Sequence, residues 1–195
     1  MDERLEAWLA SLLATPGLSS IRDPATARRV HIEESLAALE AVQRFHGPLV
    51  DVGSGGGAPG IPLAAALPAR QVTLLEANRR KCSFLQEAAV GFPNVEVVWG
   101  RAEEQETDRF GVAVAKALAP PPVAAEWCLP LVAPGGAAIL YVGPSADVAA
   151  VDRVAGLLGA APAERASGLL VLAKLEPTPA GFPRRPGVAK KRPLA

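Results

Sequence analysis

The sequence is poor in the residues that metal centres, disulfide frameworks and membrane spans require. It has only two cysteines, Cys82 and Cys128, and they form no spaced set of metal ligands. No apolar run reaches the roughly 18 residues of a membrane span. The opening MDERLEAWLASLL is too acidic, and too well patterned as a helix, for a secretory signal. We therefore expect a reduced, cytoplasmic protein with no metal site and no membrane segment.

Net charge is also lacking, but only as an average over the chain. The formal charge is zero, whereas residues 177–195 contain five basic residues and no acid, so residues 1–176 carry −5. The basic residues are Arg184, Arg185, Lys190, Lys191 and Arg192. This asymmetry favours a polyanionic partner, with a merely solvated basic tail as the alternative.

Apolar runs alternate with helical patterns along most of the chain. Helices are predicted over residues 5–13, 24–42, 60–68, 79–90, 123–131 and 145–158. Strands are predicted over residues 49–52, 71–75, 95–99, 112–118, 137–142 and 169–175. This order predicts a parallel sheet with helices on both faces, and a last strand that pairs antiparallel at the edge. We expect a helical cap over 1–47, an α/β domain over 48–176 and a Pro- and Arg-rich tail over 177–195.

The segment LVDVGSGGGAPGIP, residues 49–62, concentrates glycine where the first strand gives way to a helix. Glycine lets the backbone turn sharply and approach a ligand closely, because no Cβ intervenes. The residues expected at the ligand are Gly53, Ser54, Gly55, Gly57 and Ala58. The spacing also satisfies the dinucleotide fingerprint, so a dinucleotide site and a tight structural turn remain as alternatives.

Carboxylates near this loop favour S-adenosylmethionine over a dinucleotide. Asp51 precedes the first loop glycine by two residues, where it can meet an ammonium group but would repel a pyrophosphate. Glu76 ends the second strand, where it can accept both ribose hydroxyls, as it also would in a dinucleotide fold. The loop at 100–103 can read the adenine edge, or it can form only a capping box. A dehydrogenase would need a substrate domain, and the chain has no room for one.

The loop after the fourth strand, KALAPPP at residues 116–122, bears on the atom that receives the methyl group. It lacks the polar and aromatic residues that amine-methylating enzymes place there. Cys82 and Cys128 fall on predicted helices, so we expect core residues rather than nucleophiles. A purine nitrogen such as guanine N7 already has a free lone pair and needs only orientation. We therefore expect no general base, and a positioning role at most for Lys116.

The chain resembles the 16S ribosomal RNA guanine-N7 methyltransferase family, known as RsmG or glucose-inhibited division protein B. The matching stretches are LSSIRDPATARRVHIEESLAAL, LVDVGSGGGAPGIPLA, GRAEE, KALAP and PTPAGFPRRPGVAKKRPL. The resemblance implies the α/β fold of class I S-adenosylmethionine-dependent methyltransferases, which is Rossmann-like with a mostly parallel sheet, plus a short N-terminal helical cap. It places at the cofactor Gly53, Ala58, Glu76, Ala77, Ala102, Glu103 and Lys116.

The resemblance also implies a partner. The substrate would be a guanine in a decoding-region loop of 16S ribosomal RNA, within the small ribosomal subunit, and we expect the chain to act as a monomer. RNA contacts are expected from Arg28, Arg29, His31, Arg184, Arg185, Lys190, Lys191 and Arg192. For the histidine, an incidental surface position is the alternative.

Three basic positions of the family pattern are changed. Lys116 stands where arginine is typical, and it lacks the planar fork of arginine. Val142-Gly143 replaces a lysine-glycine pair, and Ser167-Gly168 replaces a basic pair. These changes motivate a rival function, an RNA- or ribosome-binding protein with a methyltransferase fold and little or no turnover. A nicotinamide-dependent oxidoreductase is a third alternative, disfavoured by the missing second domain.

Overall fold

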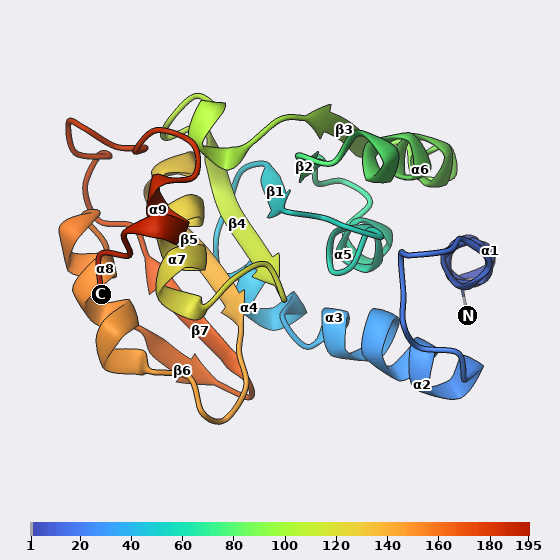
Figure 1. Ribbon diagram of the computed structural model, residues 1–195. Coiled ribbons are helices and arrows are strands. Elements are labelled where there is room, and N and C mark those ends of the chain that lie inside the picture. The colour runs from blue at the N-terminus through green and yellow to red at the C-terminus, as the bar shows by residue number, and fades with distance from the viewer. Residues whose placement is uncertain (1) are drawn as a thin grey trace.

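A computed structural model describes residues 2–195 and places a twisted sheet between two layers of helices (Figure 1). Within those residues the sheet has seven strands, in the order β3-β2-β1-β4-β5-β7-β6. The strands are β1 (Leu49–Val52), β2 (Val72–Glu76), β3 (Val95–Trp99), β4 (Phe110–Lys116), β5 (Val132–Tyr141), β6 (Glu164–Ala166) and β7 (Leu169–Ala173). The first five strands are parallel to one another, whereas β7 runs antiparallel to both β5 and β6.

Helices fill the connections between the strands. The α-helices are α1 (Glu3–Ala14), α2 (Pro24–Arg28), α3 (Glu34–Leu36), α4 (Leu39–Gln43), α5 (Gly60–Ala66), α6 (Arg79–Ala89), α7 (Pro121–Cys128), α8 (Val148–Leu157) and α9 (Val188–Lys191). A π-helix η1 (Arg29–Glu33) and two 3-10 turns, η2 (Ala102–Glu104) and η3 (Leu129–Leu131), complete the set. No helix in the described part of the chain is long and apolar enough to cross a membrane.

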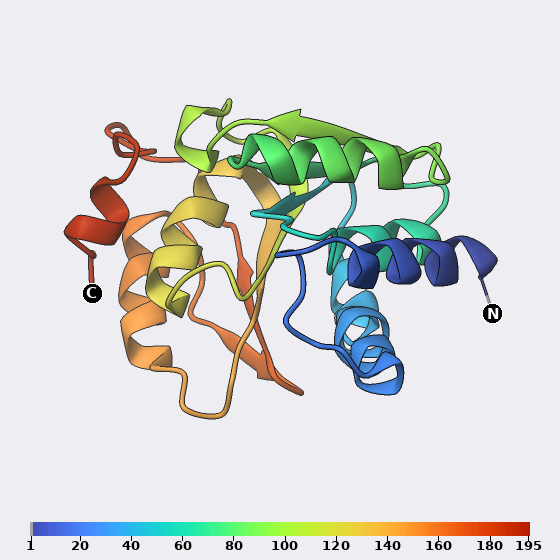
Figure 2. The same cartoon turned by 45° about the vertical axis from the view of Figure 1, so that its right-hand side comes forward.

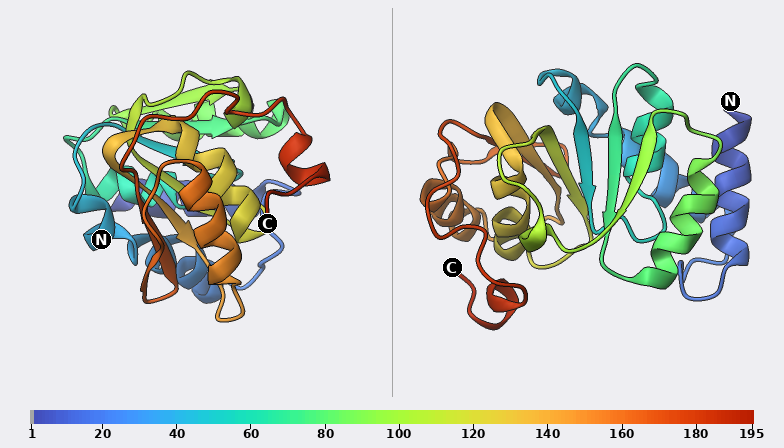
Figure 3. Two further views of the ribbon diagram at one scale, coloured as in Figure 1. Left: turned by 90° about the vertical axis from the view of Figure 1, so that its left-hand side faces the viewer. Right: turned by 90° about the horizontal axis from the view of Figure 1, so that it is seen from above.

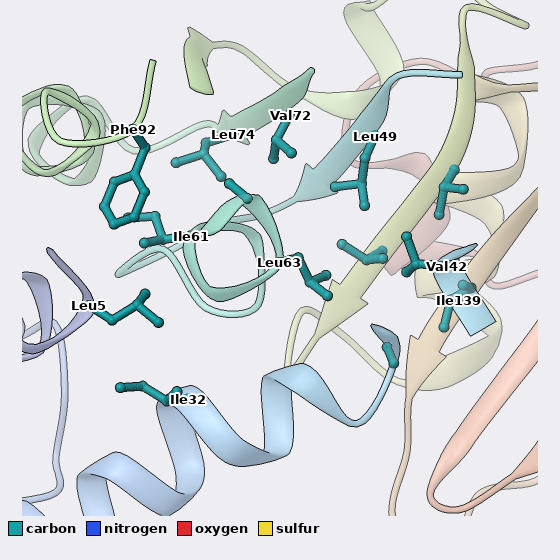
Figure 4. Close-up of a cluster of buried hydrophobic side chains, with 14 of the residues drawn as sticks. Leu5, Ile32, Val42, Leu49, Ile61, Leu63, Val72, Leu74, Phe92 and Ile139 are labelled. Atoms are coloured by element: carbon teal, nitrogen blue, oxygen red, sulfur yellow. The ribbon is translucent and has the colours of Figure 1, made fainter. Parts of the chain in front are cut away.

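The sheet carries a hydrophobic core on each face. Helices α1 to α6 cover one face, where Leu49 of β1 and Ile139 of β5 meet Ile61 of α5 and Ile32 of the cap (Figure 4). Helices α7 and α8 cover the other face (Figure 2), and Val50 belongs to that core. Neighbouring strand residues thus belong to opposite cores, as the period of two in a strand requires. The central strands β1 and β2 are buried along their whole length, which matches the predicted doubly covered sheet.

The N-terminal cap is tied to the glycine loop. Asp2 caps α1 by accepting from the Arg4 amide, and the buried stripe of α1 includes Trp8, whose indole donates to Gly56 O at 2.9 Å. The second predicted helix is not continuous, since it divides into α2, η1, α3 and α4. Ser35 Oγ donates to His31 O at 2.8 Å, and such back-bonding bends helices. The helix predicted over 24–42 is therefore present, but it contains a π-helical segment and a turn at residues 37–38.

The other end of the sheet also corrects the sequence prediction. The pairing of β7 is antiparallel, as predicted, but β7 is not the edge, because the short strand β6 pairs outside it. Strand β6 reads Glu-Arg-Ala, which has no apolar alternation to reveal it. Beyond β7 the chain continues to α9, which lies beside α7. The two termini lie at opposite ends of the sheet (Figure 3).

Candidate functional site

Two adjoining pockets lie where β1, β2 and β4 end. The β2-side pocket has a volume of about 260 Å³ and is bordered by Glu76, Ala77 and Ala102. The cap-side pocket has a volume of about 250 Å³ and is bordered by the glycine loop and the cap. The residues that border both are Gly53, Lys81 and Ala117. The two pockets are therefore one groove across the carboxyl ends of the strands, where open α/β sheets bind ligands.

The glycine loop is built for close approach. Gly53, Gly55 and Gly57 have φ values of +72°, +57° and +101°, a region that other residues rarely adopt. A Cβ on Gly53 would lie 2.3 Å from Leu118 Cδ1, so a side chain there would require Leu118 to move. Ser54 Oγ donates to Asp51 O at 2.8 Å and holds the turn. Loop residues Gly53, Ser54, Gly55 and Ala58 border the cap-side pocket, whereas Gly57 does not.

Glu76 faces the β2-side pocket from the end of β2. Its Oε2 accepts from the Gly55 amide at 2.9 Å and its Oε1 from the Asn78 amide at 2.7 Å. A carboxylate has about four acceptor sites, so each oxygen can still accept one more hydrogen bond. The two backbone amides thus fix the carboxylate in place while leaving it able to bind a pair of hydroxyl groups.

Asp51 lies beneath the groove rather than in its wall. The side chain is 1% exposed and borders neither pocket. Its Oδ2 accepts from Gly60 N at 3.0 Å, in the first turn of α5, and its Oδ1 has no hydrogen-bond partner among the described residues. Burial raises the pKa of this carboxyl from 3.8 to about 7. Asp51 therefore supports the loop from beneath and has one buried oxygen without a partner among the described residues.

The loop after β3 forms the capping box that the sequence allowed, and it also borders the β2-side pocket. Ala102 borders the β2-side pocket, and Glu104 closes a capping box by accepting from Arg101 N at 3.2 Å. Glu103 also borders this pocket, and its Oε1 accepts from Gly187 N at 3.1 Å. A carboxylate considered for the ligand is thus already in contact with the C-terminal segment.

The basic tail packs against the domain at this point. Arg184 forms two hydrogen bonds of 2.6 Å with Glu126 of α7, a carboxylate only 3% exposed. Lys190 of α9 borders the β2-side pocket, although it is exposed overall. The other basic side chains of the tail, Arg185, Lys191 and Arg192, are exposed. Local sequence patterns carry no signal for this return of the tail, because its partners lie more than 50 residues away.

Lys116 ends β4 and joins the cap to the groove. Its ammonium group donates to Val30 O and lies 3.5 Å from Glu34 Oε2. Burial lowers the pKa of Lys116, and Glu34 opposes that shift. His31 borders the same cap-side pocket, with Nε2 3.1 Å from Ser19 Oγ. The pKa of His31 is lowered by burial and, to a smaller extent, by Lys116.

The two cap arginines that were expected to contact RNA, Arg28 and Arg29, are paired with acids. Arg28 contacts Glu6, and Arg29 donates to Glu34 at 2.9 Å. Sequence reasoning did not single out Glu34, which meets both Arg29 and Lys116. Its neighbours along the chain gave no hint, because Lys116 is 82 residues away. The cap thus places an acid beside Lys116, as well as the expected basic groups.

The cysteines are buried, as predicted for core residues. Cys128 has no exposed surface, and burial raises the pKa of its thiol. Cys82 Sγ donates to Glu76 O at 3.1 Å, and burial raises its thiol pKa too. A thiol with a raised pKa is a poor nucleophile. Across residues 2–195, no three His, Cys, Asp or Glu side chains are grouped so as to hold a metal ion.

Comparisons with known proteins agree with this geometry. The T. thermophilus 16S rRNA N2 guanine methyltransferase, solved with AdoMet and guanosine, matches with a TM-score of 0.56 at 16% identity over 78% of this chain, which spans 41% of that protein. A SAM-dependent O-methyltransferase from Thermotoga maritima matches with a TM-score of 0.60 at 16% identity, over 84% of this chain and 73% of its own. These likenesses confirm the predicted fold of class I methyltransferases.

Sequence comparison is more specific. A family model described as rRNA small subunit methyltransferase G matches residues 3–155. A protein named ribosomal RNA small subunit methyltransferase G, from Synechococcus elongatus, is 37% identical over 91% of this chain and 82% of its own length. The chain therefore belongs to the rRNA small subunit methyltransferase G family.

Proposed function

We propose that this protein transfers the methyl group of S-adenosylmethionine to N7 of a guanine in 16S ribosomal RNA. The observation that carries the proposal is the groove at the carboxyl edge of the sheet. There a glycine loop with positive φ values faces the fixed carboxylate of Glu76, in a chain of the small subunit methyltransferase G family. The names of the relatives support a ribosomal RNA substrate.

The residues of the groove fit S-adenosylmethionine. Glu76 would accept the ribose hydroxyls in the β2-side pocket, beside Ala77, while Ala102 and Glu103 border the adenine. The methionine end would lie along the loop in the cap-side pocket, above Asp51. The free Oδ1 of Asp51 suits the cationic character of that ligand. The loop residues proposed to contact it are Gly53, Ser54, Gly55, Gly57 and Ala58.

The chain's own task in the reaction is to bind and orient. The bound cofactor supplies a methyl group on a positively charged sulfur, and guanine N7 has a lone pair with no proton to remove. Holding that nitrogen in line with the methyl group accounts for most of the rate, since well-oriented reactants gain about 7–11 kcal/mol. Lys116, at the rim of the cap-side pocket, would position the acceptor. No side chain has to act as a base.

The RNA contacts are part of the same proposal. Exposed basic groups of the tail, and Arg28, Arg29 and His31 of the cap, would meet phosphates or bases. Arg184 and Lys190 are less available to RNA. Arg184 is paired with Glu126, and Lys190 borders the β2-side pocket. The monomeric state, the cytoplasmic location and the division at residues 47 and 176 stay predictions.

A nucleoside analysis tests the proposal. Small-subunit RNA is incubated with the protein and labelled S-adenosylmethionine, digested, and its nucleosides separated by chromatography. We expect the label in N7-methylguanosine. Label in an exocyclic amine, a ribose or a pyrimidine would overturn the assignment. Cofactor binding without any label would favour the rival function, an RNA-binding protein without turnover, which the changes at Lys116, Val142 and Gly168 motivate.

A further inference from the structure

A third pocket lies beside the groove, on the side of β5. This β5-side pocket has a volume of about 480 Å³, within the roughly 300–1,000 Å³ of small-ligand sites. It is bordered by Glu34 of the cap, by Tyr141 of β5 and by the loops at Gly143 and Gly168. Lys116 and Ala117 border both this pocket and the cap-side pocket. The β5-side pocket therefore adjoins the place proposed for the methionine end of the cofactor.

Two charged side chains, Lys116 and Glu34, border this pocket at different distances from the cap-side pocket. Lys116 is the group shared with the cap-side pocket, whereas Glu34 borders the β5-side pocket alone. The ammonium group of Lys116 has three donors, of which one goes to Val30 O and one points toward Glu34 Oε2, 3.5 Å away. Glu34 accepts from Arg29 at 2.9 Å through its other oxygen. Each group thus retains hydrogen-bonding capacity for a ligand that lies beside the pair in this pocket.

Guanine presents complementary groups in the same order. Along its edge follow the acceptors N7 and O6, then the donors N1–H and the exocyclic amine. If N7 points toward the methionine end, O6 comes beside Lys116 and the two donors come beside Glu34. We propose that the β5-side pocket holds the acceptor guanine, with Lys116 donating to O6 and Glu34 accepting from N1–H and the exocyclic amine. This inference rests on the proposed function, and it assigns the residues that select the base.

The same arrangement would reject adenine. Adenine has an amine where guanine has O6, so two donors would meet at Lys116. Its N1 is an acceptor, so two acceptors would meet at Glu34. Polar groups that a bound base covers and leaves without partners make sites of this kind selective by large factors. A base can enter only when it is unstacked, which agrees with a looped RNA segment as substrate.

Substituted RNA combined with a Glu34 variant tests the inference. After the methylated guanosine has been mapped, RNA is assembled by ligation with inosine at that position, which removes the exocyclic amine but keeps N7, O6 and N1–H. For the wild type we expect kcat/KM to fall about tenfold or more with inosine. Glu34→Ala should lower kcat/KM on guanosine and show little further loss on inosine. Glu34→Gln, which keeps the size of the side chain, should also lose most of the discrimination.

Two controls separate the possible failures. Glu33→Ala changes an exposed acid on the same turn that does not border the pocket, so it should discriminate as the wild type does. Affinity for S-adenosylmethionine should be unchanged in the Glu34 variants, since Glu34 borders neither the β2-side pocket nor the cap-side pocket. If N7 is methylated but both Glu34 variants lose as much with inosine as the wild type, the base-selecting role is wrong and the proposed function stands. Label at another atom would overturn both.

Discussion

Asp51 and Glu76 show how surroundings give two similar carboxylates different properties. Asp51 lies in β1 and Glu76 ends β2, and these two buried parallel strands are neighbours in the sheet. Glu76 accepts hydrogen bonds from two backbone amides and faces a pocket. Asp51 accepts one amide with one oxygen and is sealed beneath the loop. The carboxylate of Glu76 is thus suited to binding hydroxyl groups, whereas the buried carboxyl group of Asp51 is sensitive to charge placed near it.

Replacing Glu76 tests its role as the ribose acceptor. Glu76→Ala should weaken the binding of S-adenosylmethionine by about 1.5–3 kcal/mol, the range for hydrogen bonds to charged groups. Isothermal titration calorimetry measures the change. Glu76→Gln is the matched control, since it keeps the shape and one acceptor oxygen and should lose less. Wild-type affinity in Glu76→Ala would exclude this role.

The stability of the protein should depend on pH through Asp51. Because the folded-state pKa is raised from 3.8 to about 7, the folded protein keeps a proton that the unfolded chain releases between these pH values. The stabilisation is thus present below pH of about 4 and is lost as pH rises through about 7. Relative to Asp51→Asn, the free energy of unfolding of the wild type should fall by up to about 1.4 kcal/mol per pH unit across this window.

Urea denaturation of both proteins at a series of pH values measures this difference. The comparison cancels the other titrating groups, because the two proteins share them. A difference that stays constant with pH would show that Asp51 remains ionised in the folded state.

At the scale of elements, length and apolar patterning decide what the sequence predicts well. Strands β1 and β3 have the predicted bounds, and α6 differs from its prediction by one residue. Strand β6 and helix α9 were missed, because three and four mostly polar residues leave no periodic pattern. The loop and Glu76 were found as site candidates because they adjoin apolar strands. Glu34 and the packing of the tail depend on contacts between distant segments, which no local pattern encodes.

The ion pair between α7 and the tail offers a test of element packing. Arg184→Ala would leave the carboxylate of Glu126, 3% exposed, without its partner. We expect a loss of about 3 kcal/mol in the free energy of unfolding, at the low end for a broken buried pair because Arg184 retains 21% exposure. Adding Glu126→Gln should recover part of the loss. Chemical denaturation measures each variant.

The chain contains a matched control for this pair. Arg44 and Glu164 also form two hydrogen bonds, at 2.8 and 2.7 Å, but on the surface. Arg44→Ala should therefore lower the free energy of unfolding much less than Arg184→Ala does. Equal losses for the two arginines would mean that burial of Glu126 adds nothing.

Salt dependence of RNA binding reports on the molecule as a whole. Of the five basic tail residues, three are exposed and do not border the β2-side pocket, namely Arg185, Lys191 and Arg192. Replacing these three with alanine should lower the slope of log K against log salt by about 2, since each contact to single-stranded RNA contributes about 0.7. Filter binding at several salt concentrations measures the slope. An unchanged slope would mean that these side chains are only solvated.

The cofactor groove is bordered by both ends of the chain. Leu12 of α1 and His31 of η1 border the cap-side pocket, and Lys190 of α9 borders the β2-side pocket. The termini lie at opposite ends of the sheet, so the groove lies between segments that are far apart in sequence (Figure 1). Cofactor affinity should therefore depend on the tail even when no RNA is present.

Removing residues 187–195 tests this dependence while keeping Arg184 and its partner Glu126. The truncation takes away Lys190 and releases Glu103 from Gly187, so one wall of the β2-side pocket is lost. We expect affinity for S-adenosylmethionine to fall about tenfold, which corresponds to about 1.4 kcal/mol. Lys190→Ala should show part of this loss, whereas Lys191→Ala, one residue further on and not at the pocket, should show none. Calorimetry without RNA measures the affinities, and wild-type affinity in the truncated protein would restrict the tail to RNA contacts.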